Sequence, residues 1–186
     1  MKYISVGYVH KKGYEFSMEI AHAGFVFPIT GMLAELWLRG STGFSSAETP
    51  LERQGLNQLE RMGLVVRTDG SPAEEYRALT CCTLVPVEAR RPYWFLTQME
   101  TTVLRWLRES GLHLSMAELT YLIDRKVPLE PGLLGRENAQ ALVQRIYTTD
   151  TIFDNILEGQ METAQARERV VRAMLRLLKK KRIVLL

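Results

Sequence analysis

The spacing of apolar residues changes at Pro28, from every second residue to every third or fourth. Before Pro28, the segments 3–9, 14–20 and 25–27 are rich in β-branched and aromatic residues, and 14–20 alternates strictly between apolar and polar. Such alternation predicts strands that bury one face. After Pro28, apolar residues recur at helical spacing over most of the chain. We therefore expect an α+β fold that is mostly helical and has small β-sheets.

Two helices and a hairpin are predicted in the N-terminal half. Residues 29–39 carry one apolar stripe and are followed by a glycine. Thr49 and Pro50 mark the start of the second helix, because a capping hydroxyl precedes a proline at the first helical position. Gly63 ends it. The hairpin is expected to consist of a strand at 64–67, a turn at 68–72 and a returning strand at 76–87.

The C-terminal half is predicted to be helical up to a final strand. Ser115 and Glu118 have the spacing of a capping box, in which each side chain bonds the backbone N–H of the other residue. Helices are expected at residues 96–110, 115–123, 136–147, 151–157 and 162–181, and the strand at 183–186.

The polar segment 88–92, which ends in a proline, is the best candidate for a domain boundary. We expect two packed modules, residues 1–90 and residues 93–186. Trp37 and Trp106 lie on apolar helical stripes of the two modules and are expected to be buried.

The two cysteines, Cys81 and Cys82, are adjacent and cannot staple the fold. We expect them to be unbridged, with one thiol buried and the other exposed, as in a cytoplasmic protein. No apolar run approaches the roughly 18 residues that span a bilayer, and the N-terminus lacks the features of a signal peptide. The sequence thus predicts a cytoplasmic protein that does not enter the membrane.

Motifs of catalysis and cofactor binding are missing from the sequence. It contains no phosphate-binding G-x-x-x-x-G-K-[ST] loop and no G-x-S-x-G nucleophile elbow. His10, His22 and His113 have no metal-ligand spacing. We therefore predict no catalytic residues, no cofactor and no metal, and expect the protein not to be an enzyme.

Positive charge is concentrated at the C-terminal end. Residues 167–186 hold eight Lys and Arg and one Glu, a net charge of +7, so the rest of a chain with net charge +3 carries −4. This asymmetry favours contact with a polyanion or an acidic protein. The alternative is a solubilising helix face, with basic residues favoured near the helix C-terminus.

The candidate binding residues lie on two predicted helices. In the last helix, basic residues recur at helical spacing opposite the apolar stripe, which suits phosphates along a nucleic-acid backbone. In the 50–62 helix, the polar residues are of types that reach base edges in a major groove, although such residues also cover ordinary exposed helices. The candidates are Arg169, Arg172, Arg176, Lys179 and Lys180 in the last helix, and Arg53, Gln54, Asn57 and Arg61 in the other.

Residues 49–87, preceded by the 29–39 helix, resemble the winged-helix superfamily. The segment 56–67, Leu-Asn-Gln-Leu-Glu-Arg-Met-Gly-Leu-Val-Val-Arg, is similar to a signature of that superfamily, a helix followed by Leu-x-x-x-Gly-Leu-Val and a wing. The second half has three helices in a comparable order. The resemblance implies two winged-helix-like modules in tandem.

A second resemblance starts from the N-terminal strands. Three strands followed by helices and a Leu-x-x-Leu-x-x-x-Gly-Leu-Val ending are similar to the small peptide-recognition domains of ribosomal-peptide maturation. Those domains add a leader peptide as an extra strand to an exposed sheet edge. The resemblance implies a peptide partner for the N-terminal strands.

Together these features lead us to expect a DNA-binding protein, a transcriptional regulator that contacts phosphates of double-stranded DNA through its basic C-terminal helix. A homodimer through the 96–110 helix is a further expectation. The alternative is a non-enzymatic adaptor on a winged-helix scaffold, with an acidic protein or peptide as its partner.

Overall fold

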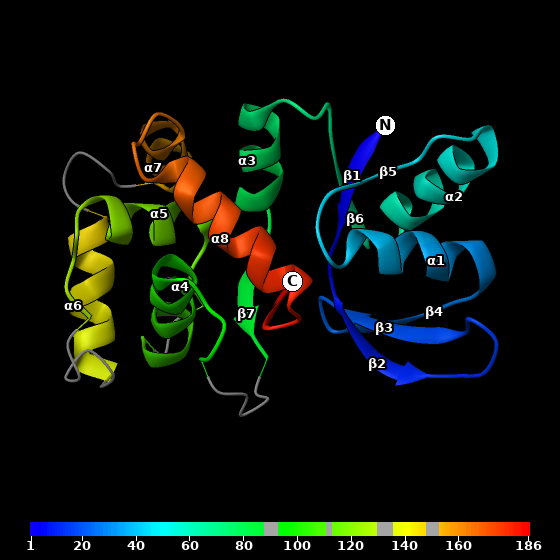
Figure 1. Ribbon diagram of the computed structural model, residues 1–186, viewed down its shortest axis with the longest axis horizontal. Helices are drawn as coiled ribbons and strands as arrows, with labels where there is room; N and C mark the ends of the chain where they lie inside the picture. Colours follow the sequence, from blue (N-terminus) through cyan, green and yellow to red (C-terminus); the bar gives the residue numbers. More distant parts are fainter. Residues whose placement is uncertain (88–92, 111–112, 130–135, 148–152) are drawn as a thin grey trace.

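A computed structural model describes residues 1–87, 93–110, 113–129, 136–147 and 153–186 of the chain (Figure 1). The helices of this part are α1 (Gly31–Gly40), α2 (Pro50–Arg61), α3 (Pro72–Thr80), α4 (Gln98–Glu109), α5 (Met116–Asp124), α6 (Arg136–Ile146), α7 (Asp154–Glu162) and α8 (Arg167–Lys179). The strands are β1 (Lys2–Ser5), β2 (Tyr8–Lys12), β3 (Met18–His22), β4 (Phe25–Ile29), β5 (Ser45–Ser46), β6 (Val65–Thr68), β7 (Leu84–Pro86) and β8 (Ile183–Leu185). The predicted α+β class, mostly helical with small sheets, is confirmed.

Each sheet of the described residues is small and antiparallel. β1 is the middle strand of the first sheet, between β5 and β6. β2, β3 and β4 form a meander. β7 pairs with β8. On its other side, the segment that contains β7 forms an isolated bridge, from Thr83 to Ser115.

Gly7 divides the predicted strand 3–9 into two strands that belong to different sheets. Its φ of +95° favours glycine, and a Cβ at this position would lie 2.8 Å from Ile20 Cγ2 and 2.9 Å from the Ala21 carbonyl oxygen. The chain can turn from β1 into β2 at this point because no side chain is present.

The predicted returning strand at 76–87 is wrong over its first half, which is helical. Ser71 caps α3 by accepting a hydrogen bond from the backbone N–H of Glu74, and Pro72 occupies the first turn. Residues 71 and 72 thus begin a helix instead of completing a hairpin turn. β6 pairs with β1, the N-terminal strand, and the predicted wing hairpin does not form.

The two halves repeat one order of elements. In the first, the middle strand β1 precedes helix α1, edge strand β5, helix α2 and the opposite edge strand β6. In the second, the segment around β7 takes the place of the middle strand and is followed by α4 and by the bridging residue Ser115. Four helices ending in α8 then lead to β8, on the opposite edge. The ends of α2 and α8 also match, because Leu64 N–H donates to the Leu59 carbonyl and Arg182 N–H to the Leu177 carbonyl, each at 2.9 Å.

Buried hydrophobic residues group into two clusters, which meet at β1. Tyr3 belongs to the cluster of the N-terminal half, and Ile4, on the opposite face of the strand, belongs to the other. Tyr76 and Leu84, from α3 and β7, pack with the C-terminal cluster. The predicted boundary at 88–92 lies outside the described residues, and the division into modules 1–90 and 93–186 stays a prediction.

Several side chains lie as predicted. Trp37 and Trp106 are buried, one in each cluster. Cys81 is exposed, Cys82 is buried, and neither forms a disulfide; both follow a helix, although a strand was expected there. Burial raises the pKa of the Cys82 thiol to about 12, so this thiol stays protonated. In the part of the chain that the structure describes, no helix is long and apolar enough to cross a membrane.

The apolar residues of α4 pack against other elements of the same chain. Val103, Leu104, Trp106 and Leu107 are buried in the C-terminal cluster, where α4 packs against α8 and β7. The apolar face of the helix through which a homodimer was expected is therefore covered by the chain itself. A homodimer stays a prediction, but the apolar face of α4 is not free to form its interface.

Candidate nucleic-acid interface

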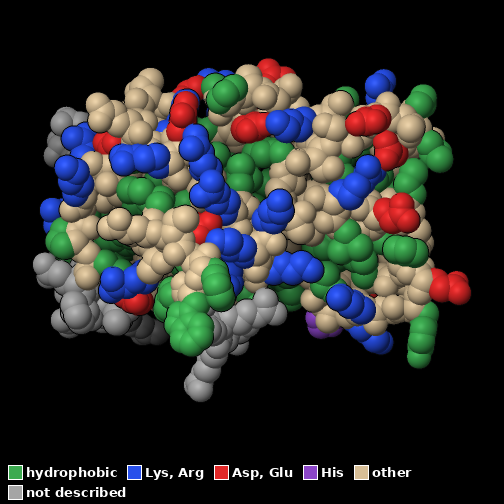
Figure 2. Space-filling view, viewed as in Figure 1, with side chains coloured by type: hydrophobic (Ala, Val, Ile, Leu, Met, Phe, Trp, Pro, Cys, Tyr) green, Lys and Arg blue, Asp and Glu red, His purple; other side chains and the backbone are tan. Residues whose placement is uncertain are grey.

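α8 is an amphipathic helix that packs against α4, α5 and β8. Its buried face consists of Val170, Ala173, Met174, Leu177 and Leu178. Figure 2 shows Lys and Arg side chains gathered along the diagonal course that α8 takes through the middle of the view in Figure 1. One face of the helix thus anchors it in the core, and the other carries positive charge to the surface.

Four of the predicted phosphate-binding side chains on α8 are exposed and unpaired. Within the described residues, Arg169, Arg172, Arg176 and Lys179 form no ion pair and no side-chain hydrogen bond. At 3.6 residues per turn they fall within an arc of about 80°, and they extend over about 15 Å of the helix axis. We call these four residues the α8 basic face.

Lys180, the fifth predicted residue, is engaged with a buried carboxylate. Its Nζ lies 2.8 Å from Glu100 Oε2 and 2.9 Å from the Phe95 carbonyl oxygen. Glu100 also accepts a hydrogen bond from the Thr97 N–H, at 2.7 Å, in a capping box at the start of α4. Burial alone raises the pKa of Glu100, but the bonds from Lys180 and Thr97 outweigh it and hold this pKa below its ordinary value. Lys180 therefore joins α8 to α4.

The predicted base-reading residues on α2 are exposed, but one of them is engaged. Asn57 Oδ1 accepts a hydrogen bond from the Arg67 guanidinium, which also lies 2.6 Å from Glu60 Oε2. Arg53, Gln54 and Arg61 are also exposed, and within the described part of the chain their side chains have no polar partner. The surface of α2 therefore combines basic, amide and acidic groups.

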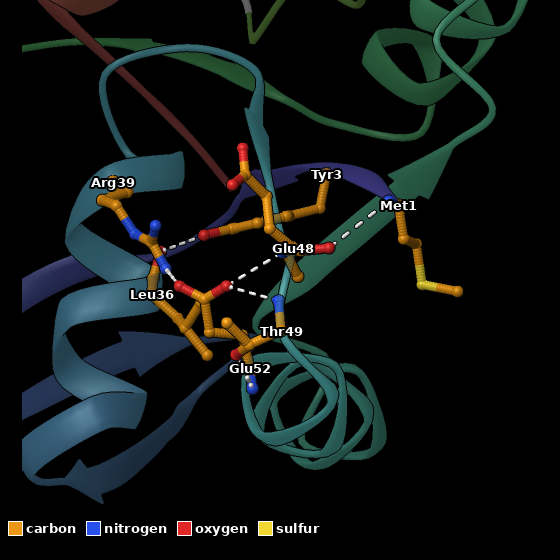
Figure 3. Close-up of polar contacts among 8 residues, drawn as sticks. Met1, Tyr3, Leu36, Arg39, Glu48, Thr49 and Glu52 are labelled. Carbon is orange, nitrogen blue, oxygen red and sulfur yellow. Dashed lines mark hydrogen bonds and ion pairs between the residues drawn. The ribbon is translucent and has the colours of Figure 1, made fainter.

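Polar contacts around Glu52 hold the start of α2 against α1 (Figure 3). Glu52 Oε2 accepts hydrogen bonds from the backbone N–H groups of Glu48, at 2.8 Å, and Thr49, at 3.1 Å, and its other oxygen pairs with Arg39. These bonds, chiefly that from Thr49, lower the pKa of Glu52 to about 2. Tyr3 Oη donates to the Leu36 carbonyl at 2.8 Å and ties α1 to β1. The orientation of α2 is thus fixed by local contacts.

The structure does not bring the two predicted sets of residues together. α2 packs against α1 and β6, while α8 packs in the other half of the molecule (Figure 1). The pairing of Lys180 with Glu100 joins residues 80 positions apart and had no signal in the sequence. The α8 basic face, in contrast, follows directly from the helical period.

The described residues contain no group of three or more His, Cys, Asp or Glu placed to hold a metal ion. His22 is half-buried, and burial lowers its pKa, which favours the neutral imidazole. Comparison with known proteins found no matching family model, no matching curated protein and no matching solved structure.

Proposed function

We propose that the chain is a non-enzymatic, DNA-binding regulatory protein that contacts the phosphates of a duplex through the α8 basic face. The observation that carries the proposal is that Arg169, Arg172, Arg176 and Lys179 are exposed along one side of a helix, with no partner among the described residues. Exposed ion pairs contribute little to folding stability, so the fold does not need acidic neighbours for these cations and leaves them free for a partner. A row of cations without acidic neighbours favours an anionic partner outside the chain.

The geometry of α8 suits a duplex. The helix has 13 residues, a length of about 20 Å, and its opposite face is fixed in the core. A helix of this kind lies in or beside a major groove about 12 Å wide, where basic side chains contact phosphates on its edges. Each neutralised phosphate releases counterion, which favours binding without reading sequence. Phosphate contacts of this kind account for affinity, while any sequence preference would have to come from other residues.

The proposal is tested by measuring the affinity of the protein for a labelled random-sequence duplex by fluorescence anisotropy near 50 mM salt. The double variant R172A/R176A removes two contacts from the centre of the α8 basic face. With each exposed contact contributing up to about 1 kcal/mol, we expect affinity to fall roughly tenfold, equally for all sequences.

The matched control is K11A/R145A, which removes the same charge from two exposed positions, on β2 and α6, whose side chains have no polar partner among the described residues. It should bind nearly as well as the unchanged protein, because the proposal assigns binding to a surface and not to net charge. R53A/R61A tests α2 in the same way. The proposal fails if the unchanged protein does not bind duplex, or if R172A/R176A and its matched control weaken binding equally.

A second candidate function, a protein- or peptide-binding adaptor, is favoured by aromatic side chains on the β-meander. Tyr14, Phe16 and Phe25 are respectively 94%, 61% and 67% exposed. Tyr14 and Phe16 lie together in the turn between β2 and β3, while Phe25 lies at the opposite end of β3, and neighbouring exposed apolar side chains are typical of protein contacts. In that case the α8 basic face would contact an acidic protein, and labelled polyglutamate would bind while duplex would not.

A further inference from the structure

A cavity of about 800 Å³ lies where the two halves of the molecule meet. Its walls come from β2 and α1 on one side, and from β7, β8 and the end of α8 on the other. In Figure 1 the C-terminus, beyond α8, lies in the middle of the molecule, facing the half that contains α1 and β2. The volume is that of sites for small molecules, which range from roughly 300 to 1,000 Å³.

The lining is mostly apolar and has a positive rim. Leu38 from α1, Val85 from β7 and Val184 from β8 contribute apolar surface. The lining also includes two lysines, Lys12 and Lys181, and no acidic side chain among the described residues. An apolar wall with a few polar groups of one charge favours a ligand that has an apolar body and an opposite charge.

The backbone of β8 borders this cavity along the edge that faces away from β7. Leu186 and Thr83 exchange both backbone hydrogen bonds, at 2.9 and 2.7 Å. Antiparallel alternation then directs the N–H groups of Ile183 and Leu185 away from β7. Ile183 and Leu185 border the cavity but are each only 2% exposed, and Gly7 already contacts this edge, so the cavity is characterised by its side chains.

The same edge is unsuited to an added peptide strand. Gly7 N–H donates to the Leu185 carbonyl at 2.7 Å and so blocks pairing beyond this residue. β8 is only three residues long, and strand addition gains its affinity from a run of backbone hydrogen bonds. The edge therefore favours a compact ligand over a polypeptide.

We propose that this cavity binds a small amphiphilic anion, with its apolar chain against Leu38, Val85 and Val184 and its anionic group near Lys12 and Lys181. A medium-chain carboxylate has this chemistry. The proposal does not depend on DNA binding, since none of the four residues of the α8 basic face lines the cavity.

The first experiment is a calorimetric titration of the full chain with decanoate. We expect saturable binding of one molecule per chain. The variant V184W places an indole in the cavity and should abolish this binding. L38W fills the cavity from α1, at a half-exposed position that tolerates change, and should do the same. Thermal unfolding confirms that each variant is folded, and L38W provides the test if V184W is not.

The second experiment tests the charge. Decanol has the same chain without the anion and should bind more weakly than decanoate. K12M and K181M should each weaken decanoate binding roughly twofold to fivefold and leave decanol binding unchanged. The matched control K11M removes an exposed neighbouring charge that does not line the cavity, and it should have no effect.

Three results would overturn the proposal: no saturable binding of decanoate, binding that both V184W and L38W leave intact, or equal binding of decanol and decanoate. An acidic peptide that binds in the cavity where decanoate does not would show that the occupant is a polypeptide. DNA binding can fail while decanoate binds, and the reverse, so each proposal is tested separately.

Discussion

Glu100 has a carboxylate that is fully buried within the fold and depends on Lys180 for its charge partner. The variant K180M leaves this carboxylate with the hydrogen bond from Thr97 N–H but without its cation, and losing a partner of a buried polar group costs about 1–3 kcal/mol. We expect a loss of that size in the free energy of unfolding, measured by urea denaturation. K179M, which removes an exposed and unpaired lysine, should change it by less than about 0.5 kcal/mol.

A double-mutant cycle separates this pairing from other effects. In the background E100Q the buried group is neutral, so adding K180M should have little further effect on unfolding. If K180M costs as much in the E100Q background as in the unchanged protein, the ion pair is not what stabilises this contact.

The pH dependence of stability should be visible at Glu52. Its pKa is lowered from an ordinary 4.5 to about 2, chiefly by the hydrogen bond from the Thr49 N–H. A carboxyl whose pKa is lower in the folded state stabilises the fold above the ordinary pKa, and this contribution is lost as pH falls from about 4.5 towards 2. The difference in unfolding free energy between the unchanged protein and E52Q should therefore shrink over this range. A difference that does not vary with pH would contradict this explanation.

At the scale of elements, α1 approaches β1 through a glycine. A Cβ at Gly40 would lie 2.7 Å from Tyr3 Cε2 and 3.0 Å from the Ser5 backbone nitrogen. We expect G40A to destabilise the protein by about 1–3 kcal/mol, because the helix would be forced away from the strand. Gly159 in α7 offers the matched control, since a Cβ there meets nothing within 4 Å.

For G159A we expect a gain of roughly 0.5–1 kcal/mol, the ordinary effect of alanine in place of glycine inside a helix. Thermal or urea unfolding measures both variants. Equal effects of the two substitutions would show that the close approach of α1 to β1 does not constrain Gly40.

Helix starts were predictable where their signals are local. Thr49 with Pro50, and Ser115 with Glu118, identify helix N-termini from adjacent side chains, and both form capping boxes in the structure. Ser71 and Pro72 have the same pattern as Thr49 and Pro50, yet the neighbouring Asp-Gly favoured a turn. The sequence around residues 69–72 was therefore compatible with both a turn and the start of a helix, and the structure has the helix α3.

At the scale of the whole molecule, pairings between distant segments were not predictable. Nothing near β6 indicates that its partner is β1, some 60 residues earlier, instead of the segment that follows. Likewise, the contact between Glu100 and Lys180 and the cavity between β2 and β8 depend on how the halves pack. The exposed α8 basic face was predictable, because it follows from the period of a single helix.

Salt dependence of duplex binding tests the central claim most directly, because each contacted phosphate contributes about −0.9 to the slope of log affinity against log salt. For the unchanged protein we expect a steep negative slope, and for R172A/R176A a slope flatter by roughly two units with little change in stability. The same slope in both proteins, or no measurable duplex binding near 50 mM salt, would contradict the assignment of phosphate contacts to α8.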